Sequence, residues 1–186
     1  MRLFVAIEIP QDICAAYSAL LKEFRAIAPQ AKWVRAENLH VTLKFLGETD
    51  AAKLGAVHNA LGAIRSEQAV TLEFCGLGFF PNERRPRVFW AGMEASANLK
   101  TLASQIDHAA HRLGFPLEDR PFTPHLTLAR FDPPGIAPKL GDAIRTHAAQ
   151  SFGSLATREF HLIESKLKPT GAEYTTVQTV RFAPEA

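Results

Sequence analysis

Short runs of alternating apolar and polar residues are separated in this sequence by segments whose apolar residues recur at helical spacing. The helical spacing predicts helices at Asp12–Ile27, Ala51–Ile64, Ala97–Leu113 and Ala137–Ala149. The alternating runs predict strands at Arg2–Ala6, His40–Phe45, Val70–Phe74, Gly76–Phe80, Arg87–Ala91, His125–Leu128, Thr157–Lys166 and Thr175–Phe182. Short connections near the C-terminus favour antiparallel pairing, so the pattern predicts an α+β fold.

The order strand, helix, strand, helix, strand occurs twice, and two sequence matches share one spacing. Arg2–Ala6 matches Arg87–Ala91, and His40–Leu43 matches His125–Leu128, each with an offset of 85 residues. We interpret this as an internal repeat within a single domain. The domain spans residues 1–186, and its repeat units cover about 1–80 and 87–182. Two such lobes facing each other would bring the two His-x-Thr-Leu motifs together across a central cleft.

Strict alternation along a strand places the histidine and the threonine of each motif on one face. The residues expected on the two polar faces are His40, Thr42 and Lys44 in the first strand, and His125 and Thr127 in the second. The aliphatic neighbours, together with Phe45, are expected on the core side. Duplication alone would explain the shared leucines. A polar pair retained on the non-core face of both halves indicates a shared ligand.

Histidine can act as an acid or a base near pH 7, and a threonine hydroxyl can donate to an oxyanion. Two imidazoles on opposite sides of one phosphorus atom would suit an in-line displacement at a phosphodiester. The sequence has no H-E-x-x-H motif, no cysteine–histidine cluster and no dense acidic cluster. The pattern therefore predicts a phosphoesterase that needs neither a metal nor a cofactor.

The composition limits the classes of partner that the protein could bind but does not identify one. The 186 residues carry a formal charge of +2, which is small for a protein that coats a long nucleic acid, yet permits an RNA end or a nucleotide. Cys14 and Cys75 show no C-x-x-C spacing, as expected of reduced thiols in the cytoplasm. Glu8 and Pro10 interrupt the first apolar run, and no stretch approaches the roughly 20 residues of a membrane span. We expect a cytoplasmic monomer with no membrane contact and no obligate protein partner.

The motifs and their surroundings resemble the two-histidine phosphoesterase superfamily. Within it the chain is similar to the bacterial RNA 2′,3′-cyclic phosphodiesterases, historically called 2′-5′ RNA ligases. The matching segments are Arg2–Ile7, Trp33–Arg35, Asn38–Glu48, Phe122–Arg130 and the spaced residues from Ser165 to Tyr174. The resemblance implies a bilobal fold with pseudo-twofold symmetry, and hydrolysis of a ribose 2′,3′-cyclic phosphate on RNA ends or nucleotides to a 2′-phosphate. It also implies that His40 is the general acid and His125 the general base.

Arg130 is the candidate that breaks the repeat. It lies five residues after His125, whereas the equivalent residue after His40 is Phe45. A guanidinium suits phosphate binding, and the resemblance points to the same role. Strict alternation, however, puts Arg130 on the face opposite His125, so it reaches the cleft only if the strand bulges or ends near Ala129, or if its side chain curls round the edge. An ordinary surface arginine is the alternative.

Four aromatic residues could stack on a base, although an aromatic residue in an apolar strand more often lies in the core. They are Phe4, Trp33, Phe122 and Phe131.

Three other functions stay open from the sequence. The same site could join RNA ends through a 2′-5′ linkage or cleave such a linkage. The chain has no K-x-D-G motif and no P-loop, so ligation driven by ATP has no visible basis. A non-catalytic module that binds RNA ends is the third possibility, and it predicts tight binding without turnover.

Overall fold

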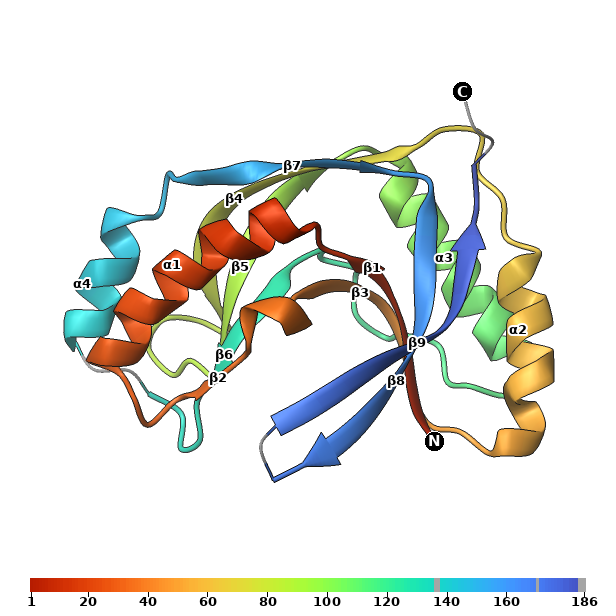
Figure 1. Cartoon of the computed structure of the whole chain (residues 1–186), viewed down its shortest axis with the longest axis horizontal. Helices are drawn as coiled ribbons and strands as arrows, with labels where there is room; N and C mark the ends of the chain where they lie inside the picture. Colours follow the sequence, from red (N-terminus) through yellow and green to blue (C-terminus); the bar gives the residue numbers. More distant parts are fainter. Residues whose placement is uncertain (136–137, 170, 184–186) are drawn as a thin grey trace.

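The computed structural model describes residues 1–135, 138–169 and 171–183, and Figure 1 shows the arrangement of their helices and strands. The strands are β1 (Arg2–Glu8), β2 (Lys32–Trp33), β3 (His40–Glu48), β4 (Val70–Phe80), β5 (Val88–Ala95), β6 (Leu126–Arg130), β7 (Ser151–Thr157), β8 (Glu159–Lys168) and β9 (Gly171–Arg181). The helices are α1 (Gln11–Ile27), α2 (Leu54–Gly62), α3 (Asn98–His111) and α4 (Pro138–Thr146), with 3-10 turns η1 (Ala36–Asn38) and η2 (Ala51–Lys53).

All four predicted helices are present, and the fold is α+β as expected. Ala137, where the fourth helix was predicted to begin, lies outside the described residues. The two runs predicted around Cys75 form one strand, β4, whose pairing with β5 is irregular between Phe74 and Leu77. The sequence pattern missed β7, a glycine- and serine-containing segment whose strand conformation depends on its pairing with β4.

The strands form two antiparallel sheets. The first has the order β3-β1-β8-β9, and the second has the order β2-β6-β5-β4-β7. In the first sheet, β3 carries the first motif and pairs with β1, the first strand of its repeat unit. In the second sheet, β6 carries the second motif after His125 and pairs with β5, the first strand of the other unit. The two motifs therefore occupy corresponding places in the two sheets.

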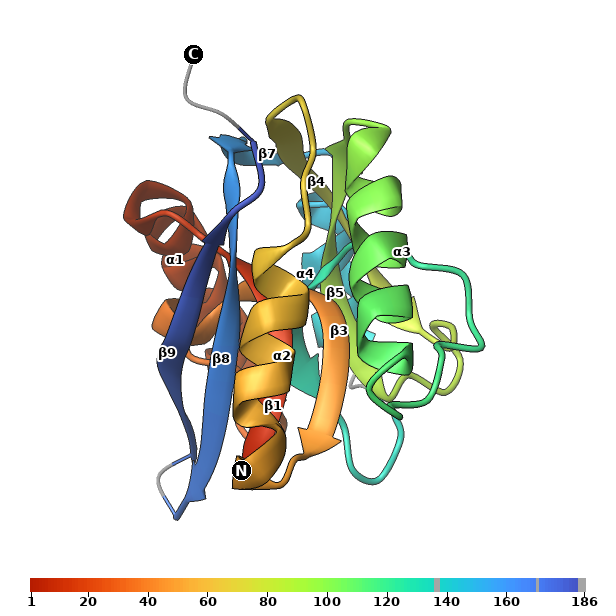
Figure 2. The ribbon, with the colours of Figure 1, turned by 90° about the vertical axis from the view of Figure 1, so that its right-hand side faces the viewer.

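The two sheets form two lobes, as expected, but each lobe contains strands from both halves of the sequence. β4 follows the first motif in the chain but lies in the second sheet, and β8 and β9 return to the first sheet. The helices α1 and α3 likewise pack against strands from the other half of the sequence. Tyr17 of α1 stacks on Phe152 of β7, and α3 packs against β3. In Figure 1, α1 and α4 lie at one end of the molecule, and α2 and α3 at the other, where Figure 2 shows them side by side.

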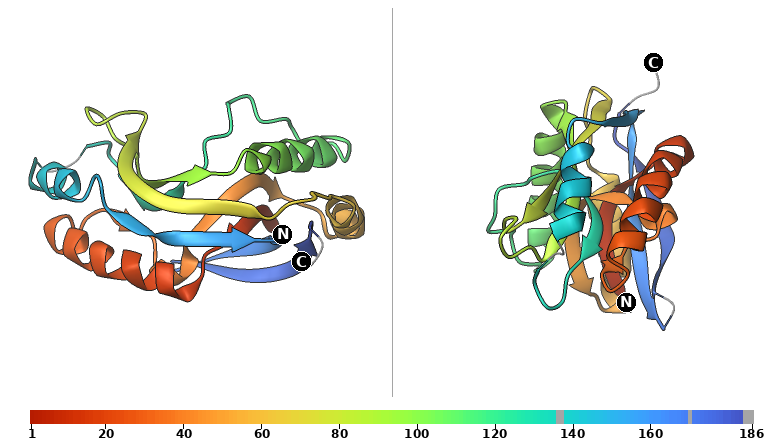
Figure 3. Two further views of the ribbon diagram at one scale, coloured as in Figure 1. Left: turned by 90° about the horizontal axis from the view of Figure 1, so that it is seen from above. Right: turned by 90° about the vertical axis from the view of Figure 1, so that its left-hand side faces the viewer.

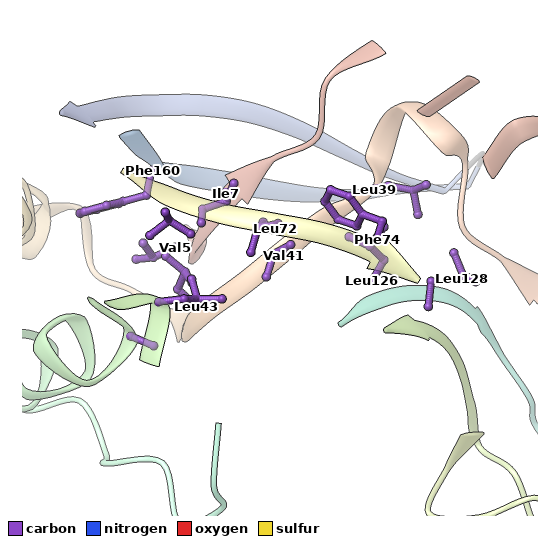
Figure 4. Close-up of a cluster of buried hydrophobic side chains, with 14 of the residues drawn as sticks. Val5, Ile7, Leu39, Val41, Leu43, Leu72, Phe74, Leu126, Leu128 and Phe160 are labelled. Atoms are coloured by element: carbon purple, nitrogen blue, oxygen red, sulfur yellow. The ribbon is translucent and has the colours of Figure 1, made fainter. Parts of the chain in front are cut away.

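One apolar core joins the two sheets. Val5 and Val41 from the first sheet pack in the same cluster as Leu72 and Leu126 from the second (Figure 4). The two further views in Figure 3 show the helices placed around the outside of the strands. Because the sheets share a core, the relative position of the two motif strands is determined by close packing.

Across residues 1–135, 138–169 and 171–183, no helix has the length and apolar character needed to cross a membrane.

Candidate active site

Both motif strands contain a β-bulge directly after the motif threonine. In β3, Thr42 pairs with Ala6 but Lys44 pairs with Val5, so Leu43 is skipped. In β6, Thr127 pairs with Trp90 and the next paired residue is Ala129, so that Leu128 is skipped. Each bulge leaves two consecutive residues buried and reverses the alternation beyond it.

The bulges place Arg130 and Phe45 on the faces of the motif threonines. Regular alternation along the strands predicted the opposite face for both residues. For Phe45 that expectation was wrong, since the ring is 58% exposed and lies 6.1 Å from the ring of Phe4. For Arg130 the structure has the bulge that was named as the condition for reaching the site.

Lys44 was expected beside His40 and Thr42, and this expectation was also wrong. The bulge turns Lys44 inward, and it is 5% exposed. Its ammonium group lies 2.5 Å from Oδ1 of Asp107 on α3 and donates to the carbonyl oxygen of Pro116 at 2.6 Å. Lys44 therefore anchors β3 to α3 and to the loop that leads towards the second motif.

The repeat is shifted by one residue between the first strands of the two halves. Ala6 faces Thr42 and Trp90 faces Thr127, so the structural equivalent of Ala6 lies 84 residues further on. The sequence match of Arg2–Ala6 with Arg87–Ala91 at 85 residues is thus one residue out of register. The motifs themselves keep the offset of 85.

Both motif histidines are oriented by the carbonyl group two residues earlier. Nδ1 of His40 lies 2.8 Å from the carbonyl oxygen of Asn38, and Nδ1 of His125 lies 2.8 Å from that of Thr123. A carbonyl oxygen only accepts hydrogen bonds, so Nδ1 carries the proton in each ring. Nε2 is then the nitrogen that takes up or releases a proton, which is the tautomer that acid–base catalysis needs.

The two imidazoles have different surroundings. The ring of His40 lies 4.7 Å from that of Phe4 and 5.3 Å from that of Tyr174. Burial lowers the pKa of His40 from its ordinary value, and the nearby His125 lowers it further; the carbonyl group of Asn38 and the carboxylate of Glu8 act in the opposite direction. The strands β3 and β6 contact each other, and the effect of His125 on the pKa of His40 is consistent with two neighbouring motifs.

The second imidazole lies beside aromatic rings from β4 and β5. The ring of Phe80 lies 5.1 Å from that of His125, and Phe80 also lies 5.3 Å from Trp90. A Cβ atom at Gly78 would collide with the indole of Trp90, so this glycine lets the ring lie flat on the sheet. Phe80, Trp90 and Tyr174 were not among the aromatic candidates from the sequence. They reach the site through pairing between distant strands, although Gly78 is a local sign of a ring lying over the strand.

Of the four aromatic candidates from the sequence, Phe4 is the one that contacts a motif histidine. Phe131 is buried beside Phe79, because the bulge in β6 turns it towards the core. Trp33 packs on Phe24 and Phe89, and its indole N–H donates to the carbonyl oxygen of Ala28. Phe122 packs against the main core.

Thr42 and Thr127 are half-buried and lie on the faces that carry the histidines. Arg130 is exposed, and its charge acts on Tyr174: burial raises the pKa of this phenol, whereas the positive charges of Arg130 and Arg2 oppose the rise. Since Tyr174 packs on His40, the guanidinium of Arg130 lies near both motifs. Among the described residues, no three histidine, cysteine or acidic side chains are grouped as a metal site.

Replacing Arg130 tests whether this guanidinium, which has no counterpart after the first motif, serves phosphate binding. Arg130→Ala should raise KM for a 2′,3′-cyclic nucleotide by roughly 10- to 100-fold, because a charge-assisted hydrogen bond to an anion contributes about 1.5–3 kcal/mol. Phe45→Ala, at the corresponding place on β3, is the matched control and should change KM by a smaller factor. Steady-state kinetics of both variants gives the comparison. Equal effects would assign Arg130 to the surface.

A model of the family described as LigT-like phosphoesterases matches residues 7–90 and 93–174. A protein of Archaeoglobus fulgidus named RNA 2′,3′-cyclic phosphodiesterase is 36% identical to the chain, over 94% of this chain and 96% of that protein. A protein of Thermus thermophilus with the same name is 35% identical, over 96% of this chain and 88% of that protein. The similarity therefore spans both motifs and nearly the whole length of each protein.

Solved structures show the same fold. The crystal structure of TT0787 of Thermus thermophilus matches with a TM-score of 0.81 and 32% identity, covering 100% of both chains. The crystal structure of E. coli LigT complexed with 3′-AMP matches with a TM-score of 0.75 and 32% identity, covering 96% of this chain and 95% of that one. The same E. coli protein has also been crystallised with ATP and with phosphate.

Proposed function

Because the chain belongs to the LigT-like family of phosphoesterases, we propose that it hydrolyses ribose 2′,3′-cyclic phosphates, on RNA ends or nucleotides, to 2′-phosphates. The observation that carries this proposal is the pair of motif histidines, each with Nδ1 held by a carbonyl oxygen 2.8 Å away. This geometry leaves two Nε2 atoms for proton transfer at one phosphate. The relatives named RNA 2′,3′-cyclic phosphodiesterase support the same substrate class.

The reaction needs one proton to be taken up and another to be released. Nε2 of His125 accepts a proton from water, and the resulting oxygen attacks phosphorus in line with the 3′ oxygen. The bond between phosphorus and the 3′ oxygen breaks, and Nε2 of His40 donates its proton to that oxygen. The products are a 3′ hydroxyl and a 2′-phosphate, and the two histidines return to their starting states after exchanging protons with solvent.

Charge gathers on the non-bridging oxygens of phosphorus during the displacement. The hydroxyl groups of Thr42 and Thr127 donate hydrogen bonds to these oxygens, and Arg130 adds a positive charge on the side of the second motif. Structures of E. coli LigT with 3′-AMP and with phosphate show that a relative of the same fold accepts these ligands. They support a nucleotide or the end of an RNA strand as the substrate.

Phosphorus NMR of the product from a 2′,3′-cyclic nucleotide tests the proposal directly. We expect a 2′-phosphate, activity that persists in excess chelator, and a bell-shaped dependence of kcat/KM on pH because one histidine must be protonated and the other neutral. A 3′-phosphate would reverse the identity of the leaving oxygen. Tight binding of the nucleotide with no turnover would instead identify a module that binds RNA ends.

A further inference from the structure

A carboxylate faces the first motif histidine but has no counterpart beside the second. Glu8 of β1 pairs directly with His40 of β3 in the first sheet. In the second sheet, Ala91 pairs with Leu126, and the residue that follows Ala91 is Gly92. Side chains of directly paired residues lie about 4.5–5.5 Å apart at Cβ, so Glu8 lies beside the imidazole of His40. His125 has a glycine at the corresponding position.

The carboxylate of Glu8 is held in place by neighbouring strands. The hydroxyl of Thr176 on β9 donates to Oε1 of Glu8 at 2.6 Å. Nδ1 of His161 on β8 lies 3.9 Å from the same oxygen, and this imidazole is only 8% exposed. His161 is itself held, since its Nδ1 lies 3.2 Å from the hydroxyl of Thr179. Glu8 therefore has a defined orientation on the face that carries His40.

Apart from Glu8, the group beside His40 that favours a positive charge on it is the carbonyl group of Asn38, and the carbonyl group of Thr123 has the same place beside His125. Phe4 and Tyr174 pack on the ring and exclude water. The titratable and charged groups facing this region are Glu8 and Arg2 from β1, His125 just before β6, Arg130 from β6, His161 from β8 and Tyr174 from β9. Burial lowers the pKa of His40 and His125 adds to this effect, whereas the carbonyl group of Asn38 and the carboxylate of Glu8 oppose both. Within this set, Glu8 is the carboxylate.

We propose that Glu8 is a positioning residue whose carboxylate stabilises the imidazolium form of His40 against the burial that opposes it, and that this support allows His40 to act as the proton donor to the leaving oxygen. The assignment of His40 as donor rests on the proposed hydrolysis of a cyclic phosphate. The structural reason is the asymmetry of the repeat: a fixed carboxylate faces His40, and a glycine occupies the corresponding place beside His125. The two motifs are therefore alike in sequence but differ in the charge that faces the imidazole.

Titration of the two imidazoles by NMR, without substrate, tests the electrostatic part of this proposal. In Glu8→Gln the pKa of His40 should fall by about half a pH unit or more, because a nearby negative charge that favours the imidazolium is lost. The pKa of His125 should change less. Thr176→Val should lower the pKa of His40 by a smaller amount, since the carboxylate remains but loses its hydrogen bond. Glu48→Gln, at the far end of β3, removes the same charge and should leave His40 unchanged.

Kinetics then connects the titration to catalysis. The limb of the pH profile of kcat/KM that reports His40 should move to lower pH in Glu8→Gln, while the other limb stays in place. An unchanged pKa of His40, or equal shifts of both imidazoles, would overturn the proposal even if the enzyme is active. If the wild-type protein hydrolyses no cyclic phosphate, the proposed function fails, yet the titration still reports whether Glu8 acts on His40.

Discussion

Loss of either motif histidine should nearly abolish hydrolysis of a 2′,3′-cyclic nucleotide. We expect His40→Ala and His125→Ala each to lower kcat by roughly 10²- to 10⁴-fold, the usual contribution of a positioned acid or base. Neither ring contributes to the main core, so both variants should fold. The double variant should be hardly less active than the single ones, because the two groups act in one displacement.

His108→Ala is the matched control for these variants. His108 is an exposed residue of α3 that contacts its own helix through Ser104. Its replacement should leave kcat and KM unchanged. Steady-state kinetics, with circular dichroism to verify folding, distinguishes the three histidines. Full activity of a folded His40→Ala or His125→Ala protein would contradict the two-histidine mechanism.

The largest effect on stability is expected at the ion pair of Lys44 and Asp107. Lys44→Met should lower the free energy of unfolding by roughly 3 kcal/mol, because it leaves a carboxylate that is only 17% exposed without its cation. For a protein of this size the change corresponds to a fall in Tm of roughly 6–12 °C. Thermal unfolding measures it. Lys100→Met, at an exposed position of α3, should change Tm by much less.

The pH dependence of the same pair has a definite sign. Burial opposes ionisation of Asp107, but hydrogen bonds from Lys44 and from the backbone of Glu118 prevail, and the pKa of this carboxyl lies below its ordinary value of 3.8. The pair therefore stabilises the protein fully at pH values above 3.8, and this contribution is lost as the pH falls through the lower, folded value. The difference between the wild type and Lys44→Met should narrow in acid. A constant difference would mean that Lys44 stabilises the fold by packing alone.

Local pattern was sufficient for the helices and for the reacting groups. Helical spacing predicted α1 to α4 because an amphipathic helix shows its buried face in its own sequence. The paired motifs predicted which histidines and threonines would lie together, and the structure brings His40 and His125 near each other. The α+β class followed from the same information.

Strand pairing decided what the local pattern left open. The bulges that turn Lys44 inward and place Arg130 on the face of Thr127 arise where β3 and β6 meet their partner strands, and an isolated run of alternating residues does not reveal them. The exchange of β4, β8 and β9 between the sheets depends on how both halves share a core. It also decides which side chains reach the first motif from the end of the chain, above all Tyr174.

The sequence by itself therefore determined the pair of His-x-Thr motifs, the helices and the class of fold, because these depend on neighbouring residues. Arg130 already indicated from the sequence that the two motifs differ, but the tertiary structure alone decided what surrounds each histidine. Contacts between residues more than 130 positions apart place Tyr174 on His40 and join Thr176 to Glu8. Burial and charge act through space, so the strands that fold against each motif set the environment of its histidine.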